Sequence, residues 1–216
     1  MLIDLHVHEK TYSGDSSLSI EEIIHQGEIR GLDGVCITDH ESQEIRYLLP
    51  RFEKETRLRL FAGAEVLTPH GDLLVYGLDK IPSTLEGTEA FIQAVNRQGG
   101  ALVSAHPFRQ NNRGFGHYLR QFAGIHVIEG YNGNTPDIHN QQAVSMAAAL
   151  NKPLAGGSDA HRKERLGIFA TSFPFTIHSE KQLTQALRKG LGVPVAFSPQ
   201  GYQLLTRHAM EQEAVS

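Results

Sequence analysis

Short apolar runs alternate with amphipathic segments along most of the chain. The apolar runs are rich in branched residues, which is typical of buried strands, and the segments between them have the spacing of helices that bury one face. We expect strands at residues 1–8, 34–40, 58–65, 73–77, 101–106, 125–129, 168–177 and 193–197, and a strand running into a turn at 153–161. We expect helices at residues 20–30, 42–56, 88–98, 136–150 and 180–189, and a short helix after residue 116. This order predicts parallel βαβ units in an α/β fold.

The strand pattern favours a barrel over an open sheet. About seven alternating strands are expected, and the first is not followed by the glycine-rich phosphate loop of a Rossmann sheet. The loops that follow the strands of a parallel barrel meet at one face, where such enzymes carry their chemistry. Because no repeat or linker interrupts the pattern, we predict one domain over residues 1–216, with a core of about residues 1–197 and a polar C-terminal tail. Beyond Tyr202 we expect a terminal helix or a frayed segment.

The composition is that of an ordinary soluble globular protein, with 40% hydrophobic and 20% charged residues. The net charge of −4 argues against binding of long nucleic acids through bulk electrostatics. The single cysteine, Cys36, excludes an intramolecular disulfide, suits a reducing cytoplasm and lies in an apolar strand. The apolar opening is interrupted by Asp4 and His6, and no run reaches transmembrane length. We therefore expect a cytoplasmic protein with no membrane attachment and no obligate protein partner.

Histidine is the unusual component, with 12 residues, many of them at the ends of predicted strands. His6 and His8 project from the same face of the first strand because side chains alternate. The pair alone is read equally well as structural or as half of a metal site. The rest of the chain supplies matching groups, and Asp159 and His161 repeat the same spacing. The candidate metal ligands are His6, His8, Asp15, His40, Glu65, His106, Glu129, Asp159 and His161.

This set is too large for one ion, since zinc typically takes about four ligands. It suffices for two or three ions that share carboxylates. Mixed imidazole and carboxylate ligands suit Zn, Mn or Fe better than Mg or Ca, which prefer oxygen. Ions roughly 3.5–4 Å apart lower the pKa of a shared water and hold the attacking and leaving oxygens of a phosphoryl transfer. Asp39 is adjacent to His40 and is interpreted as a partner that orients an imidazole.

Five short motifs resemble those of the PHP family (polymerase and histidinol phosphatase). They are His6-Val-His8, Thr38-Asp-His40, Gly63-Ala-Glu65, Ala105-His106-Pro107 and Gly156-Gly-Ser-Asp-Ala-His161. The similarity extends from residue 1 to about residue 190. It implies a distorted seven-stranded (β/α) TIM-like barrel of the PHP type, a trinuclear metal centre and hydrolysis of phosphoesters.

The resemblance also implies how the ligands are shared. One ion would be held by His6, His8, Glu65 and Asp159, with Glu65 bridging to a second ion held by His106 and Glu129. Asp15, His40 and His161 would hold the third ion. Other members of the family place His or Cys where this chain has Glu129, and a carboxylate there favours Mn or Fe over Zn.

The resulting hypothesis is a phosphoesterase in which metal-activated hydroxide attacks phosphorus. We expect His6, His8, Glu65, Asp159 and His161 to be the catalytic residues. Loop arginines are expected to bind substrate phosphate or simply lie at the surface, and Asn132 to bind substrate or cap a turn; the predicted substrate-binding residues are Arg109, Arg113, Arg162 and Asn132, with Arg165 as a further basic residue. The expected substrate is a small phosphomonoester, a nucleotide or the end of a short oligonucleotide.

Three alternatives stay open at this point. The first is a histidinol-phosphate phosphatase, although such enzymes tend to be longer than this chain. The second is an amidohydrolase-type barrel, which also opens with His-x-His but hydrolyses C–N bonds. The third is a PHP domain without catalytic activity, for which loss of several ligands would be expected, whereas all nine positions here hold residues able to bind metal.

Overall fold

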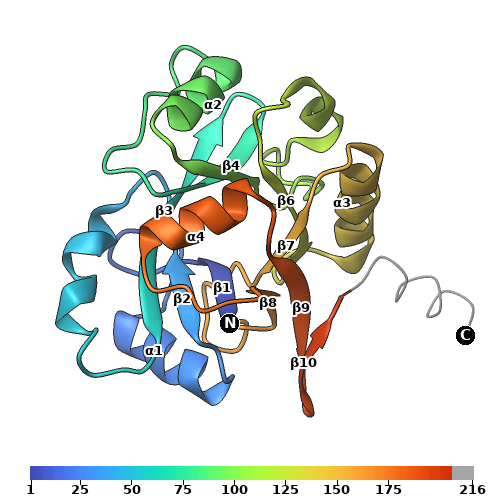
Figure 1. The fold of residues 1–216 in the computed structure, drawn as a ribbon. Coiled ribbons are helices and arrows are strands. Elements are labelled where there is room, and N and C mark those ends of the chain that lie inside the picture. The colour runs from blue at the N-terminus through green and yellow to red at the C-terminus, as the bar shows by residue number, and fades with distance from the viewer. Residues whose placement is uncertain (206–216) are drawn as a thin grey trace, which may run out of the picture.

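One curled, mixed sheet organises the chain (Figure 1), and the computed structural model describes residues 1–205. The described part contains ten strands in the order β10-β9-β8-β1-β2-β3-β4-β5-β6-β7. Their bounds are β1 Leu2–Val7, β2 Gly34–Ile37, β3 Arg59–Thr68, β4 Gly71–Tyr76, β5 Ala101–Ser104, β6 Val127–Asn132, β7 Leu154–Gly157, β8 Phe169–Ser172, β9 Val193–Ser198 and β10 Gly201–Leu204. The mixed α/β class predicted from the sequence is confirmed.

Within residues 1–205, four α-helices pack around the sheet, with bounds α1 Ile20–Ile29, α2 Thr88–Arg97, α3 Asp137–Ala149 and α4 Glu180–Arg188. Three 3₁₀ helices, η1 Glu44–Tyr47, η2 Leu49–Arg51 and η3 Gly116–Gln121, lie in connecting segments. The start of α1 is fixed by a capping box, in which the Ser19 hydroxyl accepts from the backbone N–H of Glu22 and the Glu22 carboxylate accepts from that of Ser19. All four α-helices lie where the apolar periodicity predicted them.

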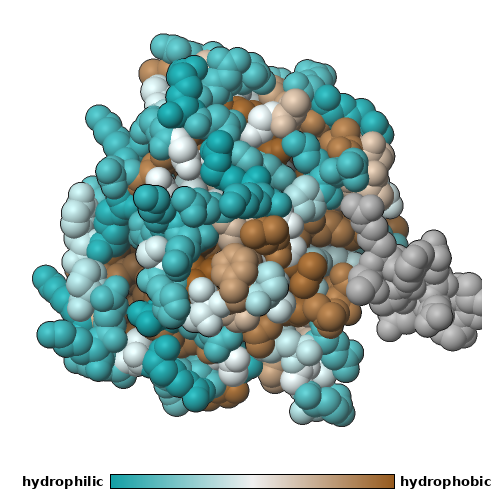
Figure 2. Space-filling view, viewed as in Figure 1, coloured by the Kyte–Doolittle hydropathy of each residue, from teal (hydrophilic) through white to brown (hydrophobic). Residues whose placement is uncertain are grey.

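A buried cluster fills the inside of the curled sheet. It contains at least one residue from each of β1 to β7, together with Leu183, Ala186 and Leu187 of α4. Helix α4 therefore packs across the end of the sheet that also holds Met1. Two further clusters lie outside, one beneath α2, η3 and α3 and the other beneath α1, η1 and η2. On the face seen in Figure 2, hydrophilic side chains cover most of the helices and apolar ones gather beside β9.

The sheet comes close to closing at the end opposite α4. The backbone N–H of Asp159, just after β7, donates to the carbonyl of His6 at 2.7 Å, and that of His8 donates to the carbonyl of Ala160 at 3.0 Å. A register irregularity in β1 lies between Asp4 and Val7. Irregularities of this kind redirect side chains. These contacts bring the beginning of the chain and the loop after β7 together at one mouth.

The seven-stranded barrel expected from the resemblance stays a prediction, because the described residues form one curled, mixed sheet of ten strands. Strands β3, β4 and β5 pair antiparallel in succession, and β8 joins β1 and β9 antiparallel. The first departure is the hairpin between β3 and β4, whose turn is formed by residues 69–70. The chain is therefore an α/β sheet with an inserted hairpin and three added strands at one edge.

Two further expectations from the sequence were wrong in part. The helix expected at residues 42–56 is replaced by η1 and η2, because Pro50 lacks an N–H donor and interrupts an α-helix. The tail beyond Tyr202 continues as part of β10, which pairs with β9 from Gly201 to Leu204. The rest of that tail, residues 206–216, lies outside the described part. Among the helices of residues 1–205, none has both the length and the apolar character needed to cross a bilayer.

Asp4 joins β1 to the two loops that complete the mouth. The carboxylate is fully buried and accepts backbone N–H groups from Ser158 at 2.9 Å, Gly167 at 2.9 Å and His6 at 3.3 Å. Replacing Asp4 with Asn puts an amide NH₂ group where one of these oxygens accepts. We expect the free energy of unfolding of the metal-free protein to fall by about 2–3 kcal/mol in a urea titration followed by circular dichroism.

The matched control for this prediction is Asp33→Asn. Asp33 accepts one backbone N–H, from Leu2, and is exposed, so water can replace the lost interaction. Its substitution is expected to cost under about 1 kcal/mol. Equal losses in the two variants would contradict the role given to the buried carboxylate.

Candidate metal centre

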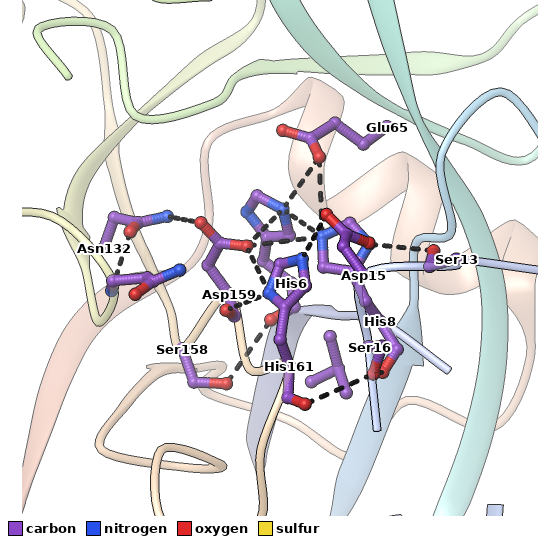
Figure 3. A network of polar contacts seen from close by, with 12 residues as sticks. His6, His8, Ser13, Asp15, Ser16, Glu65, Asn132, Ser158, Asp159 and His161 are labelled. Carbon is purple, nitrogen blue, oxygen red and sulfur yellow. Dashed lines mark hydrogen bonds and ion pairs between the residues drawn. The ribbon is translucent and has the colours of Figure 1, made fainter. Parts of the chain in front are cut away.

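The predicted ligands come together at the mouth of the curled sheet, and Figure 3 shows His6, His8, Asp159 and His161 pointing toward one another. They are supplied by strands and by the loops that follow them: His6, His8 and Asp15 from β1 and the next loop, His40 after β2, Glu65 from β3, His106 after β5, Glu129 from β6, and Asp159 and His161 after β7. The ends of the strands that carry these residues meet because parallel strands finish at the same edge of the sheet.

His6, His8, Glu65 and Asp159 surround one point. Nε2 of His6 lies 3.6 Å from Oε2 of Glu65 and 3.5 Å from Oδ1 of Asp159. Nε2 of His8 lies 3.4 Å and 3.3 Å from the same two oxygens. All four side chains are buried. The structure thus brings together the four residues expected to share one ion.

Hydrogen bonds indicate which nitrogen of each imidazole faces this point. Nδ1 of His6 lies 3.0 Å from Oε1 of Glu129, which as a carboxylate oxygen accepts. Nδ1 of His8 lies 3.2 Å from the Ser13 hydroxyl, whose own proton goes to Asp39 at 2.8 Å. Because both Nδ1 atoms donate, both Nε2 atoms carry lone pairs able to bind a cation. Asp39 therefore orients His8 through Ser13.

The two Nε2 atoms lie only 3.1 Å apart. Two lone pairs this close repel each other unless a proton or a metal cation lies between them. Burial alone would lower the pKa of His6, but the charges of Asp159, Glu129 and Glu65 outweigh it and hold this pKa well above its usual range. Burial lowers the pKa of the neighbouring His8 to about 4. In the absence of a metal ion, the acids around this pair therefore favour the protonated form of His6.

Asp15, His40 and His161 form a second group on the outer side of the first. Oδ2 of Asp15 lies 3.2 Å from Nε2 of His40 and 3.3 Å from Nε2 of His161. Nδ1 of His161 lies 3.0 Å from the backbone carbonyl of Asp159, which accepts its proton and leaves Nε2 with a lone pair. The Asp15 side chain is 59% exposed, so this group borders solvent. These are the three residues expected to hold the third ion.

Glu65 lies between the groups. Its Oε1 is 2.7 Å from Nε2 of His106, and its Oε2 is 3.0 Å from Nδ1 of His40 and also faces His6 and His8. Burial would raise the pKa of this carboxyl, but the imidazoles around it hold the pKa well below its usual range. A carboxylate whose two oxygens meet different imidazoles is arranged to bridge two cations.

Glu129 and Asn132 lie behind the imidazoles. Oε2 of Glu129 accepts the backbone N–H of His106 at 2.8 Å and the side-chain amide of Asn132 at 2.9 Å, while Oε1 faces Nδ1 of His6. Asn132 is fully buried, and its Oδ1 accepts from Arg109 at 2.7 Å. The structure therefore does not place Glu129 beside the lone pairs of His6 and His8, and substrate contact by Asn132 stays a prediction that its burial does not favour.

A cavity of about 520 Å³ opens over the cluster. Its wall includes the three arginines predicted to bind substrate, and Arg165 as well. Arg109 is anchored by Asp159 and by Thr135, and Arg113 donates from Nε to Asp72 at 2.7 Å. Arg162 is exposed at the rim. The arginines thus give a positive wall to a cavity whose floor is lined by acids and imidazoles.

The backbone is unusual at two of the predicted ligands. His106 and Asp159 have positive φ angles of 26° and 52°. Such conformations are uncommon for residues with a side chain, cost about 1–3 kcal/mol and are retained mainly at functional sites. Here each directs a side chain into the cluster.

Comparison with known proteins identifies the family. The PHP domain family matches residues 4–142, and the PHP-associated family matches residues 137–191. This chain belongs to the PHP domain family. The two matches together contain all nine predicted ligands of this PHP domain, and the resemblance seen in the motifs is confirmed.

Several relatives resemble this PHP domain. The uncharacterised protein MJ1587 of Methanocaldococcus jannaschii is 28% identical over 144 residues, which cover 61% of this chain and 83% of the relative. PsfC of Pseudomonas syringae has a TM-score of 0.66 at 18% identity, covering 88% of this chain and 93% of that one. The lesion-specific endonuclease EndoQ of Pyrococcus furiosus has a TM-score of 0.63 at 16% identity, covering 99% of this chain and 66% of that one.

Two other solved structures share the fold of this PHP domain. A protein of Bifidobacterium adolescentis, provisionally assigned as a metal-dependent phosphoesterase, has a TM-score of 0.61 at 18% identity and covers 74% of this chain and 88% of that one. An amidohydrolase of Chromobacterium violaceum has a TM-score of 0.58 at 16% identity and covers 86% of this chain and 96% of that one. At these identities the likeness shows the fold, and neighbours with different activities share it.

The residues of this PHP domain fit divalent metal ions. Four carboxylates are almost fully buried in the one cluster: Glu65, Asp72, Glu129 and Asp159. Arginine pairs with two of them, Asp72 and Asp159, and uncompensated buried charge is costly. Oδ1 of Asp159, Oδ1 of Asp72 and Nδ1 of His106 are buried without a hydrogen-bond partner. A mixed set of imidazoles and carboxylates suits Zn, Mn or Fe.

Asp72 belongs to this cluster but was not predicted from the sequence. It is fully buried near the start of β4, its Oδ2 lies 3.7 Å from Nε2 of His106, and burial together with the charge of Glu65 raises its pKa to about 6. Strand β4 runs antiparallel to β3, so its first residues reach the mouth. A charged residue directly before an apolar run and after Gly71 is the signal that would have indicated it.

Proposed function

We propose that this chain is a metal-dependent phosphoesterase that hydrolyses a small phosphomonoester, or a phosphoester of a nucleotide or short oligonucleotide. The observation that carries the proposal is the carboxylate of Glu65, whose two oxygens face different imidazoles beneath a cavity walled by arginines. Membership of the PHP family supports the same reaction class.

The proposed centre holds two or three divalent transition-metal ions, Zn, Mn or Fe. One ion would be held by His6, His8, Glu65 and Asp159. Another would be held by Asp15, His40 and His161. A further ion would lie between Glu65 and His106. When bound, the ions would lower the pKa of water and neutralise charge on phosphoryl oxygens. The distorted PHP-type barrel stays part of the proposal, supported by the backbone contacts between the loop after β7 and β1.

The chain's own side chains would position the substrate. Arg109, Arg113 and Arg162 reach the cavity, and their guanidinium groups suit the oxygens of a phosphate. Asp159 anchors Arg109 through Oδ2 while its Oδ1 faces His6 and His8, so one residue connects the phosphate-binding wall with the floor. The proposed substrate is therefore an anion small enough for a cavity of about 520 Å³.

The test is metal analysis of protein purified without chelator, followed by a substrate panel. We expect bound Zn, Mn or Fe and release of phosphate from mononucleotides, short oligonucleotides or histidinol phosphate, lost on chelation and restored by one of these metals. Turnover of histidinol phosphate alone would select the histidinol-phosphatase alternative.

The same panel includes amide and amidine substrates, because an amidohydrolase shares the fold. Release of an amine or ammonia without any phosphoester hydrolysis would contradict the proposal. A metal-loaded protein that turns over neither class would indicate a PHP domain without catalytic activity.

A further inference from the structure

Both oxygens of Glu129 already take part in hydrogen bonds inside the protein. Its Oε1 is 3.0 Å from Nδ1 of His6, and its Oε2 accepts from the backbone of His106 at 2.8 Å and from Asn132 at 2.9 Å. These contacts lie on the Nδ1 side of His6, whereas the lone pair that can bind a cation is on Nε2. A carboxylate that receives the Nδ1 proton of a histidine typically fixes the orientation and tautomer of that ring.

Asp72, unlike Glu129, has a buried carboxylate oxygen that accepts no hydrogen bond. Both its side chain and that of Glu65 are buried beside His106, and ligand atoms of these three residues lie within 4.8 Å of one another. Oδ2 of Asp72 lies 3.7 Å from Nε2 of His106 and accepts from Arg113 at 2.7 Å, while Oδ1 of the same carboxylate is buried without any hydrogen-bond partner. A buried carboxylate oxygen without a donor is costly unless a cation meets it.

We propose that Asp72, rather than Glu129, completes the ligand set of the second ion with Glu65 and His106, and that Glu129 is a positioning residue for His6. The inference rests on the proposed metal centre. It keeps one carboxylate and one imidazole beside the bridging Glu65, so the expected preference for Mn or Fe is unchanged. The ligand is supplied by the hairpin strand β4 instead of by β6.

The test compares wild type, Asp72→Asn and Glu129→Gln, each stripped of metal, loaded with Mn²⁺ and desalted before metal analysis. We expect Asp72→Asn to bind one ion fewer than wild type. Glu129→Gln should keep the wild-type number of ions but bind them about 10–100-fold more weakly in calorimetric titrations, as substitutions behind a ligand do. Asp79→Asn, an exposed carboxylate outside the cluster, is the matched control and should bind like wild type.

The outcomes separate this inference from the proposed function. Wild-type protein that binds no ion would overturn the metal centre itself, whereas a full complement of ions in Asp72→Asn, or loss of one in Glu129→Gln, would overturn the assignment of Asp72. If Asp72→Asn does not fold, crystals of Mn²⁺-loaded wild type decide by anomalous diffraction. An Asp72 oxygen at about 2.2 Å from an ion supports the inference, and a Glu129 oxygen there overturns it.

Discussion

Replacing His8 with Ala is expected to lower phosphoester hydrolysis by at least about 10³-fold, equivalent to about 4 kcal/mol of activation free energy. Nε2 of His8 lies within 3.4 Å of the oxygens of both Glu65 and Asp159, so its loss removes one of the four groups expected to hold the first ion. Far-UV circular dichroism should change little, because Val7 and Leu5, which anchor the strand, stay in place. Phosphate release under saturating metal is the measurement.

Asp159→Asn provides a second variant of the same kind. The backbone of Asp159 has φ of 52°, a conformation that Asn adopts readily, so the substitution removes charge with little added strain. His25→Ala, an exposed histidine on α1, is the matched control and should retain activity. If His8→Ala and Asp159→Asn both hydrolyse substrate at the wild-type rate, the assignment of these ligands is wrong.

Replacing Glu65 with Gln is expected to remove at least one of the bound ions and at least about 10³-fold of the activity. One oxygen of Glu65 faces His106 and the other faces His40, His6 and His8. An amide has a single oxygen, and its NH₂ group presents protons to a cation, so one side of the bridge is lost. Metal content after desalting measures the first effect and phosphate release the second.

The control for this variant is Glu44→Gln, an exposed carboxylate outside the cluster. It should leave both metal content and activity at wild-type values. Unchanged metal content in Glu65→Gln would rule out the bridging role, even if activity fell.

The sequence was sufficient to locate most of the site because its geometry follows from strand direction. His6, His40 and His106 lie at or just beyond the ends of β1, β2 and β5, and parallel strands bring such ends together. The alternation of side chains likewise placed His6 and His8 on one face. Convergence of residues far apart in the sequence was therefore predictable from local patterns.

The differences between the expected and the observed arrangement also have physical causes. Asp72 was not predicted because ligands were expected at the ends of strands, whereas in the antiparallel β4 the first residues reach the mouth. Glu129 lies at the expected depth, but its carboxylate turns toward Nδ1 of His6, a choice made by tertiary hydrogen bonds that no spacing reveals. Pro50 argues against a long helix at 42–56 from the sequence alone, since proline has no backbone N–H to donate.

The contacts between His6, His8, Asp159 and Ala160 have a consequence for how this protein responds to heat and to chelators. Asp159 N–H donates to the carbonyl of His6, and His8 N–H donates to the carbonyl of Ala160. Within residues 1–205, these are the only backbone–backbone hydrogen bonds between residues 6–8 and the loop after β7. His6 and His8 on one side of these contacts and Asp159 on the other are residues that would hold the first proposed ion. Binding of that ion would then stabilise the contact between β1 and the loop after β7, and removal of the ions would loosen the fold as well as abolish the activity.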